Sequence, residues 1–305
     1  MNLEAETQKL HDALIVEMNK ALALPQNERV RGMIRAILGK AARRFAELGA
    51  GLDRVVAEAG IAAGARWALP KFVKGYAARG AEIIPPEGPL VIAANHPAAV
   101  DSLVISAHVE RPDYKIIIGD ISFFENMPHI SEHAIYAPGP QDTNGRMAVI
   151  RKCIRHLKDG GALLIFARGG IEADPDWMSN PDGEFDQWSR SLEIFLERVP
   201  QTRVLVTIAS GVISPRAMRH PITWLRRARP DRQRLAFIYQ FLRQTLSGRE
   251  LFGLTPRVTF GEIVSGETNA HVLAEVGAAA RRVLKRHNRC FWLLTTHHLC
   301  VSLPV

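Results

Sequence analysis

A run of five apolar residues, Leu90 to Ala94, stops abruptly at Asn95, His96 and Pro97. A short and continuous apolar run of this kind is typical of a strand that is buried on both faces, as in a parallel sheet. Proline cannot donate to a sheet ladder, and it biases the residue before it away from helical angles. We therefore expect His96 in the loop at the carboxyl end of a buried strand, where open α/β sheets bind their ligands.

Asp101 lies five positions after His96, where an apolar run with helical character begins. Residues five apart in one regular helix point about 140° away from each other, so the two side chains can meet only because the turn at Pro97 intervenes. A carboxylate in the first helical turn can accept the proton of one imidazole nitrogen, which leaves the other nitrogen as a base. The pattern favours a paired His96 and Asp101, although a structural loop histidine fits the same spacing.

The string NHPAAVD resembles the motif of a histidine, four residues and an aspartate in the glycerolipid acyltransferases, the superfamily of glycerol-3-phosphate and lysophosphatidate acyltransferases. The resemblance covers about residues 90–214. It implies that His96 deprotonates a hydroxyl of the acceptor, which then attacks an acyl thioester, and that Asp101 orients the histidine. It also implies acyl-CoA or acyl-carrier protein as co-substrate, a lysophospholipid or glycerol-phosphate as acceptor, and neither a bound cofactor nor a metal.

The second motif of this family contains a glycine, an aromatic residue, an acidic residue and an arginine that grips the acceptor phosphate. The stretch GDISFFEN fits it loosely through Gly119, Phe123 or Phe124 and Glu125, with Asn126 in place of the arginine. On the resemblance, Phe123 and Asn126 are candidate substrate-binding residues. Without it, the same residues indicate a strand-to-helix loop with a buried phenylalanine pair.

The third motif of the family is a strand that ends in Phe-Pro-Glu-Gly, followed by a small residue and an arginine. Phe166 and Gly169 match it, whereas Ala167, Arg168 and Ile171 stand where proline, glutamate and arginine are usual. The residues present differ from the usual acceptor-binding set at both charged positions.

An anion site can still form in this stretch. Arg168 carries a planar guanidinium, and Gly169 and Gly170 allow backbone N–H groups to approach a phosphate closely. Glu172, in the next turn, is the candidate for the missing acid. The alternative interpretation is a Gly-Gly turn at a strand end with a solvated arginine.

The segment from Arg216 to Arg243 contains eight arginines and one acid, and it accounts for almost the whole formal net charge of +8. Aromatic residues are interleaved with the arginines. Arginines for anionic headgroups and aromatic rings at the acyl boundary are typical of an interfacial membrane contact. The residues predicted for this contact are Trp224, Arg226, Arg227 and Arg229. An arginine-rich helix packed on the domain is the alternative, and no recognised nucleic-acid-binding motif accompanies the charge.

Three scattered cysteines indicate neither a disulfide framework nor a paired metal motif, which favours a reducing compartment. Cys290, His297, His298 and Cys300 lie near one another in sequence, but their spacing matches no standard zinc pattern. No stretch approaches the roughly 18 apolar residues of a membrane span, and the N-terminus lacks the pattern of a signal peptide. We expect a cytoplasmic protein that binds peripherally to an anionic membrane surface.

Alternating buried strands and helices predict an α/β fold with a mainly parallel or mixed sheet flanked by helices, and with a helical N-terminal cap. The predicted strands are 90–94, 114–118, 135–137, 162–166, 203–209 and 258–260, and the predicted helices of this part are 101–109, 144–157, 185–199 and 269–287. The expected regions are 1–82, a helical N-terminal region with a helix break at Gly49 and Gly51; 83–265, the acyltransferase-like α/β domain; and 266–305, a C-terminal helix and tail.

Two other functions remain open at this point. A catalytically degenerate member of the same fold would bind lipid or membrane without turnover, which the missing arginine and glutamate would explain. A thioesterase-like hydrolase would use water as the acceptor and would release free acid without any alcohol.

Overall fold

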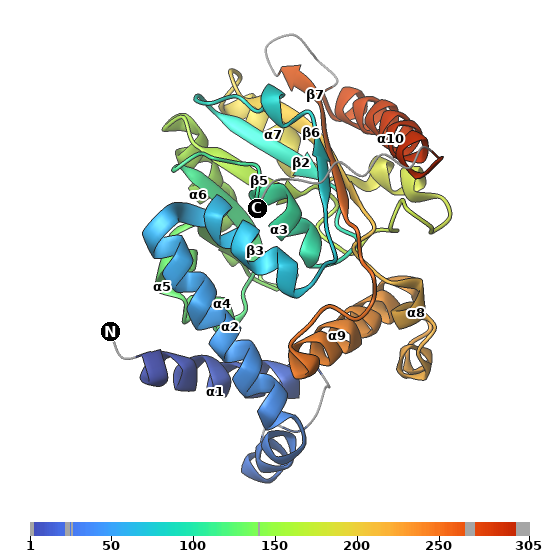
Figure 1. Cartoon of the computed structure of the whole chain (residues 1–305). Coiled ribbons are helices and arrows are strands. Elements are labelled where there is room, and N and C mark those ends of the chain that lie inside the picture. The colour runs from blue at the N-terminus through green and yellow to red at the C-terminus, as the bar shows by residue number, and fades with distance from the viewer. Residues whose placement is uncertain (1–2, 22–24, 26, 140, 266–271, 297–305) are drawn as a thin grey trace.

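A mixed sheet of seven strands forms the centre of the computed structural model, which describes residues 3–21, 25, 27–139, 141–265 and 272–296 (Figure 1). The strands are β1 (Ala77–Arg79), β2 (Leu90–Ala94), β3 (Tyr114–Gly119), β4 (Ala134–Ala137), β5 (Ala162–Phe166), β6 (Arg203–Ser210) and β7 (Arg257–Ser265). Their order in the sheet is β1-β7-β6-β2-β5-β3-β4. Neighbours run parallel except β6 and β7, which are antiparallel. The prediction of a mainly parallel or mixed sheet is confirmed.

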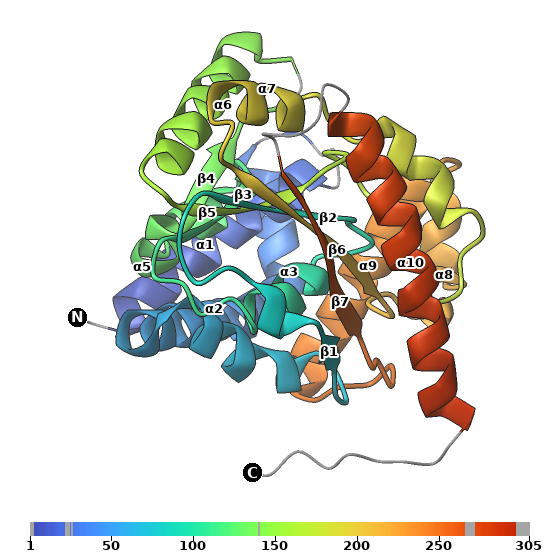
Figure 2. The ribbon, with the colours of Figure 1, turned by 90° about the horizontal axis from the view of Figure 1, so that it is seen from above.

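Helices cover both faces of this sheet, as Figure 2 shows. One face packs against residues of α2 (Glu28–Ala68), α3 (Val100–Ser106) and α9 (Arg229–Ser247). The other packs against α6 (Thr143–Lys158), α7 (Ser191–Arg198) and α10 (Val272–Thr296). The remaining helices are α1 (Leu3–Ala21), α4 (Ser122–Glu125), α5 (Pro128–Glu132), α8 (Pro215–Met218) and the 3-10 helices η1 (Leu69–Lys71), η2 (Ala81–Ile83), η3 (Pro181–Gln187) and η4 (Pro221–Leu225).

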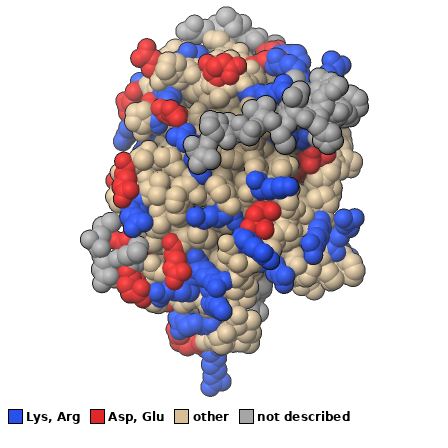
Figure 3. Space-filling model, viewed as in Figure 1, with Lys and Arg blue, Asp and Glu red and all other residues tan. Residues whose placement is uncertain are grey.

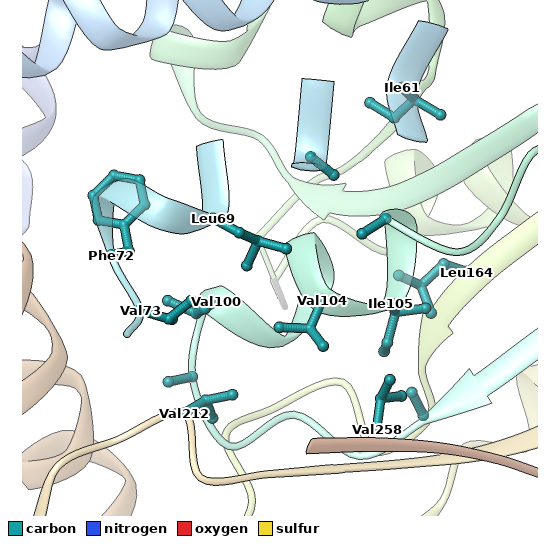
Figure 4. Packing of buried hydrophobic residues seen from close by; sticks show 14 of the residues in the cluster. Ile61, Leu69, Phe72, Val73, Val100, Val104, Ile105, Leu164, Val212 and Val258 are labelled. Atoms are coloured by element: carbon teal, nitrogen blue, oxygen red, sulfur yellow. The ribbon is translucent and has the colours of Figure 1, made fainter. Parts of the chain in front are cut away.

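The central strand β2 shows why its sequence is apolar throughout. Successive side chains of a strand point to opposite faces of the sheet. The side chains at positions 90, 92 and 94 accordingly join the core cluster of α2 and α3, and those at 91 and 93 join the cluster of α6, α7 and α10. In Figure 4, Val104 and Ile105 of α3 lie between Leu69 and the strand residues Leu164 and Val258. Every residue of β2 is fully buried, so its end is held firmly in place.

Helix α2 continues through Gly49 and Gly51, where we predicted a break. Both glycines allow a close approach instead. A Cβ at Gly49 would lie 2.7 Å from the ring of Phe123, and one at Gly51 would lie 2.8 Å from the ring of Trp67. The helix changes direction at Gly60, which has a φ of 82°. The sequence shows the glycines but not whether a neighbour or a turn requires them.

Two elements differ from those that the sequence indicates. Strand β1 was not predicted; it lies near the end of the helical N-terminal region 1–82, and it pairs with β7 in parallel. Three residues are too few to show an alternating pattern, so only the long-range pairing reveals this strand. The predicted helix 185–199 is divided into η3 and α7. The backbone of Trp188 is extended between them, and its indole N–H donates to Glu172.

Gly80 provides a test of how β1 is held against β7. Its φ of 75° is left-handed, and a Cβ there would collide with the backbone carbonyl oxygen of Phe260. Because a backbone oxygen in a sheet cannot easily move aside, we expect Gly80→Ala to lower the free energy of unfolding by about 2–4 kcal/mol in chemical denaturation. Gly248 has a φ of 69° and open space around it, so Gly248→Ala should cost only about 1–2 kcal/mol. Equal losses would contradict the collision.

Candidate active site

The turn after β2 begins with a buried asparagine that extends the sheet. The Nδ2 of Asn95 donates to the carbonyl oxygen of Ala209 in β6 over 2.9 Å, and its Oδ1 accepts the N–H of Ala209 over 2.8 Å. The side-chain amide thus replaces a peptide unit in the hydrogen-bond ladder between β2 and β6, just before Pro97, which cannot donate to that ladder. This fixes the position from which His96 projects.

The predicted contact between His96 and Asp101 is present. The Nδ1 of His96 lies 3.0 Å from Oδ2 and 3.2 Å from Oδ1 of Asp101. The carboxylate is fully buried, and it also accepts the N–H of Ala98 over 3.1 Å and that of Ser102 over 2.7 Å. Because both oxygens act as acceptors, we assign the imidazole proton to Nδ1. Nε2 then remains as the basic nitrogen.

The ring of His96 lies at the wall of a large cavity. It stacks on Phe166 of β5, with ring centroids 4.0 Å apart and planes inclined by 25°. Its side chain is 26% exposed, and it lines the cavity together with Phe166. Since Nδ1 is turned to Asp101, Nε2 is the nitrogen available to a molecule in the cavity.

The cavity has a volume of about 920 Å³ and a mainly apolar wall. Its lining comes from both faces of the sheet, with Phe45 and Phe123 on the side of α2, and Val149 and Phe195 on the side of α6 and α7. The polar side chains of the lining are those of Lys71, His96, Ser102, Arg146, Ser189, Ser191 and Arg234. A space of this size and composition suits an elongated apolar ligand with a polar group near His96.

Glu172 lies behind His96 and is buried, rather than facing the cavity. Its Oε2 accepts the backbone N–H of His96 over 2.9 Å, and its own N–H donates to the carbonyl oxygen of His96 over 2.8 Å. Its Oε1 accepts the indole N–H of Trp188 over 3.0 Å. We predicted Glu172 to be an acid that binds the acceptor, whereas its placement is that of a residue that positions His96.

Burial, hydrogen bonds and nearby charges shift the pKa values of His96 and Glu172. Burial lowers the pKa of His96, but the charge and hydrogen bond of Asp101, together with the charge of Glu172, outweigh this and raise the pKa above its usual value. Arg234 acts in the opposite direction. Burial raises the pKa of Glu172 to about 7, against the effect of its bonds from Trp188 and His96. His96 is therefore a stronger base than a free imidazole.

The other predicted substrate-binding residues are only partly at the cavity. Phe123 and Gly169 line it, whereas Asn126, Arg168 and Gly170 do not. Asn126 is exposed, and its Nδ2 donates to the carbonyl oxygen of Ser122 over 2.7 Å.

Arg168 does not present a free guanidinium fork. It donates to the carbonyl oxygen of Ile171 over 2.8 Å and to Gln187 over 3.1 and 3.2 Å, and it lies 3.7 Å from Glu184. These bonds commit its donors to the loop that it belongs to. The sequence could not distinguish this arrangement from an anion cradle, because an arginine beside a Gly-Gly turn is common to both.

The residues predicted to contact a membrane lie at one corner of the molecule. Trp224 and Leu225 of η4 are 69% and 72% exposed, and Arg226 and Arg227 are exposed beside them. Arg229 differs, because its guanidinium contacts Glu184 and donates to Gln233 over 2.8 Å. Arg229 thus joins α9 to the loop after β5.

Sequence reasoning missed the residues that position the turn from a distance. The Nε2 of Gln233 donates to the carbonyl oxygens of Pro97 over 2.6 Å and Glu172 over 2.7 Å. Nothing in the sequence around Gln233 signals this role, because its partners lie far away in the chain. For Asn95, the amide at the end of an apolar run was a usable signal.

None of the described helices has the length and apolarity of a membrane span. Among the described residues, no group of three or more His, Cys, Asp or Glu side chains is arranged to hold a metal ion. The side chains of Cys290, His297, His298 and Cys300 lie outside the described part of the chain.

The pKa of Glu172 gives a prediction about stability. Glu172→Gln keeps the shape of the side chain and removes its titration. Because the pKa is about 7 in the folded chain and 4.5 in the free group, the folded state binds this proton more tightly. The stabilisation is present below the lower value and is lost as the pH rises through the higher one. The free energy of unfolding of the wild type, minus that of the variant, should fall by about 2–3 kcal/mol from about pH 5 to about pH 8.

Urea denaturation of both proteins at each pH measures this difference. Other titrating groups are common to the two proteins and largely cancel. A difference that stays constant or grows with pH would show that Glu172 is not a buried acid with a raised pKa.

Comparisons with known proteins match the part of the chain that holds this site. Residues 76–203 match the family model described as Acyltransferase. No curated protein matches the chain in a sequence search. Among solved structures, the chain is similar to the 1-acyl-sn-glycerophosphate (LPA) acyltransferase PlsC from Thermotoga maritima, with 14% identity, 95% of each chain covered and a TM-score of 0.48. At that level the likeness does not bear on activity. The segment that matches the Acyltransferase family model includes the turn with His96 and Asp101.

Proposed function

We propose that this chain transfers an acyl group from an acyl thioester, acyl-CoA or acyl-carrier protein, to the hydroxyl of a lysophospholipid or glycerol-phosphate. The observation that carries the proposal is the pair of His96 and Asp101 at the wall of the apolar cavity. A neutral alcohol is a poor nucleophile until a base removes its proton. His96 is the base, and Asp101 orients it.

The reaction then follows from the assignment of the two ring nitrogens. The acceptor hydroxyl gives its proton to Nε2 of His96, and its oxygen attacks the thioester carbonyl carbon. The tetrahedral intermediate collapses with cleavage of the C–S bond, and the departing sulfur takes the proton from Nε2. Throughout these steps the carboxylate of Asp101 stabilises the positive charge on the ring through its bond to Nδ1.

The composition of the cavity supports an acyl chain as its main occupant. Aromatic and aliphatic side chains of α2, α4, α6 and α9 line it, and His96 is one of few polar residues among them. Burying a chain of methylene groups there is favourable by about 0.8 kcal/mol for each group. A thioester carbonyl at the polar end of such a chain would lie near Nε2.

Replacing either member of the pair tests the mechanism. His96→Ala removes the base, and we expect kcat/KM for acyl transfer from a labelled acyl thioester to fall by about 10²–10⁴-fold. Asp101→Asn should cause a comparable loss, because an amide N–H directed at Nδ1 would place the proton on Nε2.

His129 supplies a matched control. Its Nδ1 lies 2.9 Å from Oδ2 of Asp53, so it forms a similar pair, but it does not line the cavity. His129→Ala should therefore leave acyl transfer nearly unchanged. Transfer that survives His96→Ala would refute the mechanism. Release of free acid without any alcohol would identify a thioesterase-like hydrolase, and vesicle binding without turnover would identify a degenerate member.

We further propose that the corner formed by Trp224, Leu225, Arg226 and Arg227 contacts an anionic membrane surface. Two large apolar side chains are exposed beside two arginines there. In Figure 3 this corner lies at the lower right, where Lys and Arg adjoin uncharged side chains. Arginines interact with anionic headgroups, and a tryptophan suits the boundary between headgroups and acyl chains.

Removing the two arginines should weaken this contact. With vesicles that contain anionic phospholipid, Arg226→Ala with Arg227→Ala should lower the partition coefficient by about 10–30-fold, at about 1 kcal/mol for each arginine. Added salt should reduce the difference. The matched control is Arg151→Ala with Lys152→Ala, which removes the same charge from the exposed side of α6. Equal losses in both double variants would show that only net charge matters.

A further inference from the structure

The acceptor proposed above carries a phosphate, but Asn126 and Ile171 stand at the two positions where the resemblance implies arginines. Asn126 is turned to Ser122, and the donors of Arg168 are engaged within its own loop. A dianionic group next to an apolar cavity needs a cation or several donors to replace its hydration. The chain must provide that cation from another element.

Three cations line the described cavity, namely Lys71, Arg146 and Arg234. The ammonium group of Lys71 lies over the ring of Trp67, 4.1 Å from its centroid. Arg146 lies in the first turn of α6, on the side where the lining belongs to the other core cluster. Arg234, on α9, is the cation whose charge acts on His96.

Arg234 has a guanidinium that is open to a ligand. Its side chain is 63% exposed, and the ion pair that it makes within the described residues is a long one, with Asp231 at 3.9 Å. A pair of this length at the surface contributes little energy, so an incoming anion can replace it at small cost. A guanidinium also matches the oxygens of a phosphate with two parallel donors.

The backbone of Arg234 is held next to the catalytic turn. Its neighbour Gln233 is fully buried and donates to the carbonyl oxygens of Pro97, which follows His96, and of Glu172, which is hydrogen-bonded to the backbone of His96. One turn earlier, Arg229 contacts Glu184 and donates to Gln233. The start of α9 is therefore fixed to the loop that carries His96, and Arg234 projects from a rigid position.

We infer that Arg234 binds the phosphate of the acceptor and sets the preference for phosphorylated over neutral alcohols. This rests on the proposed function. In a glycerol-phosphate, only a few carbon atoms separate the reacting hydroxyl from the phosphate, so the cation that binds the phosphate must lie close to the base. Arg234 lines the same cavity as His96 and lies outside the matched segment 76–203. The anion site of this chain is thus built from α9 rather than from the second and third motifs.

The test compares two acceptors with the same acyl chain, a 1-acylglycerol 3-phosphate and a monoacylglycerol. For Arg234→Gln, we expect KM for the phosphorylated acceptor to rise by about 10–100-fold, with a smaller change in kcat and little change for the neutral acceptor. Arg234→Lys should recover part of the loss, because it keeps the charge without the planar fork. Arg243→Gln is the control, because Arg243 is an exposed arginine of the same helix that does not line the cavity.

The pH dependence of the reaction gives a second test. If Arg234 only supported the fold, replacing it would not shift this pH dependence. The charged groups that act on His96 are Asp101, Glu172 and Arg234, and Arg234 is the one that lowers its pKa. Arg234→Gln should therefore shift the acidic limb of kcat/KM for the neutral acceptor to higher pH, whereas Arg243→Gln should not.

The inference and the proposed function fail in different ways. If the wild type transfers acyl groups but Arg234→Gln keeps its preference for the phosphorylated acceptor, the inference is wrong and the proposed function stands. If the wild type transfers to neither acceptor, the proposed function is wrong, and calorimetry with glycerol 3-phosphate decides the inference. Weaker binding to Arg234→Gln than to Arg243→Gln would support it, and equal binding would overturn it.

Discussion

A single buried carboxylate organises the turn on which the rest of the site depends. Asp101 accepts hydrogen bonds from the ring of His96 and from the backbone N–H groups of Ala98 and Ser102. A buried charge without such donors would be costly, so the carboxylate requires the turn to close around it. The interaction that orients the imidazole is therefore the same interaction that shapes the backbone between β2 and α3. Function and local folding cannot be separated at this position.

Three polar residues from distant parts of the chain hold the same turn from outside. Asn95 joins it to β6, Glu172 joins it to the loop after β5, and Gln233 joins it to α9. All three are buried and bond to backbone groups, so they restrain the chain without approaching the reacting atoms. A general base must stay within hydrogen-bond reach of the proton that it removes. The restraint from three directions supplies that precision, and it makes α9 a part of the site.

Features that depend on residues close in sequence could be predicted, whereas features that depend on residues far apart in the chain could not. The strand Leu90–Ala94 and the pairing of His96 with Asp101 were predictable because each depends on residues close in sequence, an apolar run and a turn. We predicted that Glu172 binds the acceptor, whereas it lies behind His96. Its position depends on its bond to Trp188 and on the way the loop after β5 folds back to His96.

Glycines also show what cannot be predicted from local sequence. A glycine can end a helix or admit a neighbour, and the sequence does not distinguish the two cases. Gly49 admits the ring of Phe123, which lines the cavity, so a residue that looked like a helix end helps to shape the binding space. Strand β1 and the contacts of Gln233 likewise depend on pairings with residues far along the chain.

The charges around His96 also imply a coupling between binding and basicity. Two carboxylates, Asp101 and Glu172, raise the pKa of the imidazole, and Arg234 opposes them. A phosphate bound to Arg234 would neutralise that opposing charge, and its own negative charge would add to the effect of the carboxylates. The base would then be strongest when the acceptor is in place and weaker when the cavity holds only the acyl donor. Because water is the competing nucleophile in the absence of an acceptor, such a coupling would favour transfer over hydrolysis without any movement of the protein.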